Sequence, residues 1–189
     1  MTIEKGREPI NENFGTTPVR LNPEEDGEVV WGRRIDPVRV RIESIPFPRS
    51  GFRHGDIVLH DGAPVGYREY DGREYAVFNA LELFESSPYS TYEAELWLAK
   101  QEDIEVLQAI CNENDIVCED WTTSVRNICR QCSEGRPHEH HDHENEEHWR
   151  NRHSVGLAAT EDSVVRHVLE RWGNPDRRVE CFEFSIGPK

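Results

Sequence analysis

Two stretches of this chain repeat one pattern, and the repeat limits the second half of the chain to few folds. Residues 97–103 read Trp-Leu-Ala-Lys-Gln-Glu-Asp, and residues 156–162 read Gly-Leu-Ala-Ala-Thr-Glu-Asp. Each copy opens with a strand-like run, continues into a helical pattern and closes with a second strand-like run. Two strand-helix-strand copies in tandem are typical of a ferredoxin-like (split βαβ) α+β domain. We therefore predict such a domain over residues 91–189.

The hydrophobic spacing supports both copies. Apolar residues at helical spacing run from Ile104 to Cys111 in the first copy and from Val165 to Trp172 in the second. Acidic residues occupy the first turn of each predicted helix, where the helix dipole favours negative charge. The strands predicted for the two copies are 92–98, 116–121, 155–158 and 179–186.

Residues 28–85 carry a different pattern, which is typical of β-structure. Apolar residues and arginines alternate over residues 38–42, as in a strand with one buried face. An Asp-Gly pair at residues 71–72 separates two strand-like runs, 65–70 and 73–78, and predicts a hairpin. Several short strands this close together predict a small β-barrel-like unit.

Two segments predict connections rather than packed structure. Residues 1–27 contain Gly, Pro, Asn and Glu with few bulky apolar groups, which indicates a flexible arm. Residues 86–90 read Ser-Ser-Pro-Tyr-Ser and indicate a linker between the two units. Within the first unit, six arginines between residues 33 and 53, together with His54 and His60, are expected on the solvated surface because the chain is strongly acidic.

A run of metal-binding residue types lies between the two copies. Residues 129–143 join a C-x-x-C pair to four closely spaced histidines. Thiolates and imidazoles bind zinc well, and a three-residue spacing lets two such groups reach one ion. An insertion as long as residues 122–153 is usually functional or disordered, so we predict a zinc-binding module there. The candidate ligands are Cys129, Cys132, Cys118, His138, His140, His141 and His143.

The same segment also allows interpretations without a shaped zinc site. Residues 125–132 place both thiols on the apolar stripe of a helix, so the two cysteines could be core residues. The histidine run could form a loose metal-binding loop. His148 and His153 are reserve ligands. We expect Cys111 in the core and Cys181 on the outer face of the sheet.

Charge and composition limit the classes of partner. A net charge of −15 over 189 residues argues against non-specific binding to nucleic acid or to an anionic membrane. No apolar run approaches the roughly 20 residues that span a bilayer. Five cysteines without an export signal favour a reducing compartment. We expect a soluble, cytoplasmic protein whose partners are a divalent metal ion and a basic protein.

Three functions fit these observations. The first is a zinc-binding accessory or regulatory protein with a Cys/His module. The second is a metal-dependent hydrolytic enzyme with Glu139 or Glu144 as the base, although the chain has no H-E-x-x-H signature. The third is an acidic protein-interaction module without metal, because residues 79–120 hold eleven acidic residues against one lysine. The sequence does not decide whether the protein is an enzyme.

Overall fold

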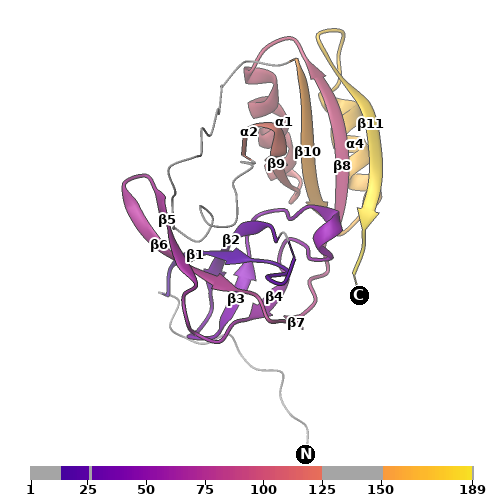
Figure 1. Ribbon diagram of the computed structural model, residues 1–189. Coiled ribbons are helices and arrows are strands. Elements are labelled where there is room, and N and C mark those ends of the chain that lie inside the picture. The colour runs from indigo at the N-terminus through magenta and orange to yellow at the C-terminus, as the bar shows by residue number, and fades with distance from the viewer. Residues whose placement is uncertain (1–13, 26, 125–150, 189) are drawn as a thin grey trace, which may run out of the picture.

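The computed structural model of the chain describes residues 14–25, 27–124 and 151–188. In this part of the chain the strands form two sheets, one of seven strands and one of four, and three α-helices accompany the second sheet (Figure 1). The prediction of an α+β protein is therefore confirmed. No helix of the described residues is long and apolar enough to cross a membrane.

The first sheet contains all the described strands that precede residue 86. These are β1 (Thr16–Arg20), β2 (Val29–Arg34), β3 (Arg39–Ile42), β4 (Ile57–Leu59), β5 (Gly66–Tyr70), β6 (Arg73–Asn79) and β7 (Glu82–Glu85), with a short 3₁₀ helix, η1 (Pro48–Ser50). Their order is β5-β6-β1-β2-β3-β4-β7. Within the described residues β5 pairs only with β6, and β7 pairs only with β4. The sheet therefore keeps two edges, and the closed barrel that "barrel-like" would imply is not formed.

Strand β1 lies inside the range that the sequence indicated as a flexible arm. It pairs antiparallel with β2 over its whole length and parallel with β6 at its end. Val19, within β1, and Leu21, just after it, are fully buried in the core of this sheet. The prediction is therefore wrong for residues 16–20, and residues 1–13 lie outside the described residues.

The predicted hairpin is confirmed as β5 and β6, which project from the sheet (Figure 1). Asp71 and Gly72 form the turn with φ values of 50° and 68°. Asp tolerates the left-handed region better than most residues, and Gly adopts it without strain. The alternation over residues 38–42 is also confirmed, because Val40 and Ile42 of β3 are buried in the core of the sheet.

The second sheet contains the two predicted strand-helix-strand copies. The first copy is β8 (Ser90–Leu98), α1 (Glu102–Glu113) and β9 (Val117–Asp120), after which comes the one-turn helix α2 (Trp121–Ser124). The second copy is β10 (Arg152–Ala159), α4 (Asp162–Trp172) and β11 (Arg177–Ile186). The strand order is β11-β8-β10-β9, and every neighbouring pair is antiparallel.

Helices α1 and α4 pack on one face of this sheet and bury the stripes that the sequence predicted. Ile104 and Leu107 of α1 meet Val165 and Val168 of α4 in a single core with the inward-facing residues of the strands. Trp172, at the end of α4, is fully buried and donates its indole N–H to the carbonyl oxygen of Asp103 at 3.0 Å. This bond fixes the end of α4 against the start of α1.

The two sheets meet through a small apolar cluster. Trp121 packs with Ile45 and Ala158, and its indole N–H donates to the carbonyl oxygen of Ile45 at 3.0 Å. The indole lies directly against β10 at Gly156, where an added Cβ atom would be only 2.4 Å from Trp121 Cζ2. Gly156 is therefore a packing requirement, because only a residue without a side chain lets the indole lie against the strand.

Candidate metal centre and the sheet junction

Most of the predicted zinc ligands lie outside the described residues. This applies to Cys129, Cys132, His138, His140, His141 and His143. The structure does describe the two points between which their segment is inserted, Ser124 at the end of α2 and Asn151 before β10. Two hydrogen bonds anchor Asn151 to the end of β8. The side-chain amide of Asn151 donates to the carbonyl oxygen of Leu98 at 2.9 Å, and the Leu98 N–H donates to the backbone carbonyl oxygen of Asn151 at 2.7 Å.

Cys118, the predicted ligand that the structure describes, lies in an environment typical of a core thiol. It belongs to β9, packs against the core beneath the helices and makes a side-chain hydrogen bond with Cys111 of α1. That hydrogen bond, together with burial, raises the pKa of the Cys118 thiol strongly. Zinc binds the thiolate, so this environment opposes a ligand role for Cys118, which stays a prediction. Cys111 is in the core and Cys181 is exposed, as expected.

A buried Asp-His pair lies at the base of the insertion. Asp120 ends β9 and His153 is near the start of β10, and both are almost completely buried, at 6% and 3% exposed. His153 Nδ1 lies 2.9 Å from Asp120 Oδ2. The other carboxylate contacts cap helix α2, where Asp120 accepts the N–H of Thr122 and the hydroxyl of Thr123.

The sequence pointed to only one member of this pair. His153 was a reserve ligand, but Asp120 lies 33 residues earlier in the chain, and no motif in the sequence connects it to His153. Within the described residues, no group of three or more His, Cys, Asp or Glu side chains is arranged to hold a metal ion. Any metal site at this place must therefore draw ligands from residues 125–150.

Two carboxylates accept hydrogen bonds from the loop between β3 and η1, which lies at the contact between the two sheets. Glu119 of β9 accepts the N–H of Ile45 at 2.7 Å, and Glu28 accepts the N–H of Phe47 at 3.1 Å. Burial raises the pKa of Glu28 to about 7; the hydrogen bond from Phe47 opposes this, and the negative charge of Glu119 adds to it. Burial also raises the pKa of Glu119, while the hydrogen bond from Ile45 lowers it. The junction therefore contains two partly buried acids, one of which titrates near neutral pH.

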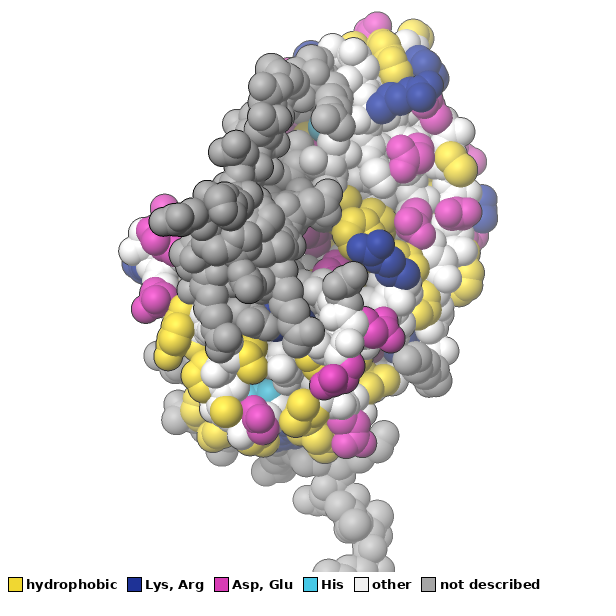
Figure 2. Space-filling model, viewed as in Figure 1, with side chains coloured by type: hydrophobic (Ala, Val, Ile, Leu, Met, Phe, Trp, Pro, Cys, Tyr) yellow, Lys and Arg dark blue, Asp and Glu magenta, His cyan; other side chains and the backbone are white. Residues whose placement is uncertain are grey.

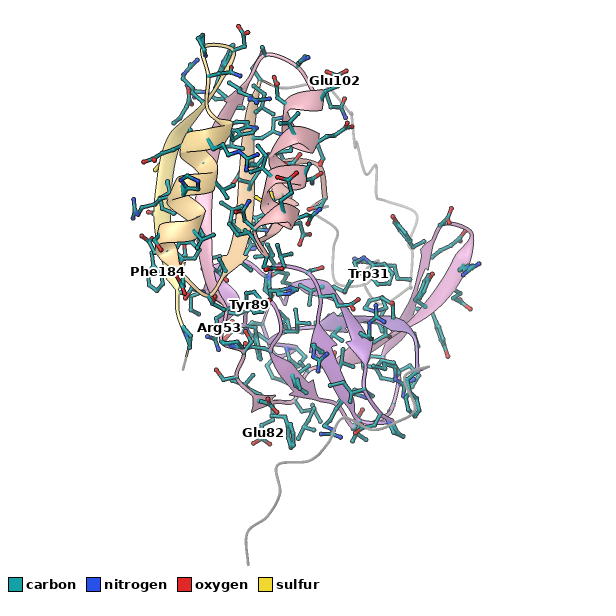
Figure 3. The ribbon with its side chains drawn as sticks, turned by 180° about the vertical axis from the view of Figure 1, so that it is seen from behind. Trp31, Arg53, Glu82, Tyr89, Glu102 and Phe184 are labelled. Carbon is teal, nitrogen blue, oxygen red and sulfur yellow. The ribbon has the colours of Figure 1, made fainter. Side chains whose placement is uncertain are left out.

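A buried ion pair orders the predicted linker. Arg53 and Asp56 are both fully buried, and Arg53 Nη2 lies 3.1 Å from Asp56 Oδ1. Asp56 accepts the N–H of Ser87, and Arg53 donates to the hydroxyl of Ser86 and to the carbonyl oxygen of Tyr89. Figure 3 shows Arg53 and Tyr89 close together at this junction. Arg53 is therefore a structural residue and not part of a solvated surface.

The two histidines of the first unit also depart from a simple surface position. His60 is 3% exposed, and its ring packs at a tilt of 37° against Phe78 with centroids 4.3 Å apart. Burial lowers the pKa of His60, and the charge of Arg34 lowers it further. His54 is half-buried, with Nδ1 lying 2.9 Å from the carbonyl oxygen of Glu43 and the ring edge-on to Tyr89.

Comparison with known proteins adds little to this geometry. No protein-family model matches the chain, and no curated protein matches it. Among solved structures, that of a hypothetical protein from Neisseria gonorrhoeae is similar, with 14% identity and a TM-score of 0.41 over 93% of this chain and 96% of that one. A similarity of this degree supports no transfer of fold or function.

Proposed function

We propose that the protein is a cytoplasmic zinc-binding accessory or regulatory protein. Cys129 and Cys132 would supply two thiolates, and two further groups would come from Cys118 and the four clustered histidines. The observation that carries the proposal is that this Cys/His run is inserted between two adjacent strands whose facing ends share the buried Asp120–His153 pair. A rigid base of this kind suits a metal module.

We infer that the second unit, which carries the insertion, is a ferredoxin-like domain. Counting β8, β9, β10 and β11 as strands one to four, the order is 4-1-3-2, with a helix in each strand-helix-strand copy. That arrangement is the split βαβ plan. The insertion then replaces the connection between the second and third strands, which are adjacent and antiparallel. A hairpin connection there needs only about 2–5 residues, so the extra length indicates that the insertion has a function of its own.

The Asp120–His153 pair supports metal binding at this place through its chemistry. His153 Nδ1 lies 2.9 Å from Asp120 Oδ2, so the carboxylate fixes the orientation of the ring at the base of the insertion. Carboxylates commonly orient zinc-binding histidines in this way. His153 therefore stays a reserve ligand, as its position after the histidine run indicated.

The test is metal content in protein purified without a histidine tag. We expect about one zinc ion per chain, and we expect the Cys129→Ser/Cys132→Ser double variant to lose it. Cys181→Ser is the matched control, because Cys181 is an exposed thiol on β11. Stoichiometric zinc in the double variant would refute the thiolate site. X-ray absorption separates the structural from the hydrolytic alternative, since four protein ligands indicate a structural ion and three indicate a catalytic one.

A basic protein partner is a second candidate, favoured by the register of β8 and β11. Glu93 and Glu183 lie directly opposite each other across these strands, and like charges in that position repel. Figure 2 shows further acidic side chains spread over the described surface in that view. A bound cationic group would relieve the repulsion. Poly-lysine should therefore bind to the protein in a salt-sensitive way. If a Glu93→Gln/Glu183→Gln variant binds poly-lysine as well as the wild type does, this face of the sheet is not the binding site.

A further inference from the structure

Two cysteines of the second unit lie against each other with their thiols in contact. Cys111 is in the last turn of α1, and Cys118 is on β9, the next strand. The thiol of Cys118 makes a side-chain hydrogen bond with Cys111. Both are free thiols, and Cys181, the other described cysteine, is exposed on β11 at the opposite edge of the sheet. The described part of the chain therefore contains one pair of thiols that can react with each other.

A tight return between α1 and β9 brings the two thiols together. The N–H groups of Asn114 and Ile116 both donate to the carbonyl oxygen of Cys111, at 2.9 and 3.0 Å. Asp115, between them, has a φ of 54°, in the left-handed region that often reverses the chain at the end of a helix. The chain therefore turns back within a few residues, and Cys118 packs against the same core that contains Cys111.

One member of the pair lies at an edge of the sheet. Cys111 is completely buried, whereas Cys118 is partly exposed. Among the described strands β9 pairs with β10 alone, so it is the outermost strand on its side of the second sheet (Figure 1). Thiols in this position suit a small, uncharged oxidant better than a bulky thiol reagent, because a bulky reagent would have to open the core to reach Cys111.

We propose that Cys111 and Cys118 form a reversible disulfide when the protein meets a hydroperoxide such as hydrogen peroxide. One cysteine sulfur attacks a peroxide oxygen, the O–O bond breaks, and a sulfenic acid and one water form. The other thiol attacks the sulfenic sulfur, the S–S bond forms, and a second water leaves. The two thiols together lose two electrons and two protons, which the peroxide takes up. A dithiol reductant restores both thiols by disulfide exchange.

The bond ties the end of α1 to a strand that makes two long-range contacts. Glu119, next to Cys118, accepts the N–H of Ile45 in the first unit. Asp120 pairs with His153 at the base of the insertion. Disulfides in a reducing compartment are usually transient and redox-sensing, which fits a bond that forms only under oxidation. This inference goes beyond the proposed zinc function and does not depend on it.

The test uses the full chain as a Cys129→Ser/Cys132→Ser/Cys181→Ser variant, in which only the proposed pair of thiols remains. Hydrogen peroxide is the probe, and the mass of the intact chain is the readout. We expect the chain to lose the mass of two hydrogen atoms and to regain it with dithiothreitol. Cleavage after Glu113 should then give two peptides joined by a disulfide, which shows that the bond connects α1 to β9.

The reaction should be slow, over hours rather than seconds. The hydrogen bond with Cys111, together with burial, raises the pKa of the Cys118 thiol, and the thiolate is the form that attacks. The oxidised chain should need more urea to unfold than the reduced chain, since the bond restricts the unfolded state. The matched control is Cys118→Ser in the same background, which keeps Cys111 without its partner and should not lose the mass of two hydrogen atoms.

Three results would overturn the proposal. The first is no loss of mass at a peroxide concentration and time that fully oxidise Cys181 in the wild type. The second is a gain of oxygen atoms without a linked peptide, which would mean that the two thiols oxidise separately. The third is a disulfide between two chains instead of within one. The linked peptide is also sought in oxidised wild-type protein, so the test does not depend on the folding of the variant.

Discussion

Replacing Glu28 by Gln should remove a large part of the pH dependence of folding. The carboxyl of Glu28 is partly buried at the sheet junction, and burial raises its pKa from 4.5 to about 7. Between these two values the folded chain holds a proton that the unfolded chain has released. The contribution of Glu28 to stability is therefore fully present below about pH 4.5 and is lost as pH rises through about 7.

The size of the effect follows from the same values. Each pH unit between the two pKa values corresponds to about 1.4 kcal/mol, so the rise from 4.5 to about 7 corresponds to roughly 3 kcal/mol. Partial contact with water lowers this, and we expect roughly 2 kcal/mol. Gln keeps a side-chain oxygen that can accept the N–H of Phe47, but it has no charge to desolvate. The variant should therefore gain stability over the wild type as pH rises.

The assay is urea denaturation followed by tryptophan fluorescence between about pH 5 and about pH 8. The difference in unfolding free energy between Glu28→Gln and wild type should grow across this range. Taking the difference cancels the opposite contribution of His60, whose pKa is lowered by burial. The control is Glu95→Gln, an exposed carboxylate on β8, which should follow the wild type. If the Glu28→Gln and wild-type curves stay parallel over the whole range, the reasoning is wrong.

Two further substitutions test the junction. Gly156→Ala should displace the Trp121 indole and cost roughly 2–3 kcal/mol, because the new Cβ would lie 2.4 Å from the ring; a lower denaturation midpoint with altered tryptophan emission would show this, and an unchanged midpoint would contradict it. Asp56→Asn should cost roughly 3–5 kcal/mol, because the charge of Arg53 would remain buried without its counter-ion. Thermal unfolding measures that loss, and a shift no larger than that of an exposed Asp→Asn control would show that the pair contributes little.

The sequence by itself determined the elements whose signals are local. The helix stripes that begin at Ile104 and Val165 are buried as predicted, because the helical period depends only on neighbours three and four residues apart. The hairpin at Asp71-Gly72 was predictable for the same reason, since its turn requires residues that accept a positive φ. The repeat then indicated how the elements of the second unit follow one another. The metal proposal also rests on a local signal, the spacing of Cys129 and Cys132 and of the histidines after them.

The tertiary structure alone decided the contacts between residues far apart in the chain. Strand β1 is short and looked like part of an arm, but it forms because β2 and β6 lie on either side and accept its hydrogen bonds. Burial of Arg53 depends on Asp56 together with serines more than thirty residues away. Cys118 was a candidate ligand by its position beside the insertion, yet packing turned its thiol toward Cys111. Sequence periodicity records which face of an element is apolar, but which side chains meet there depends on how the sheets pack.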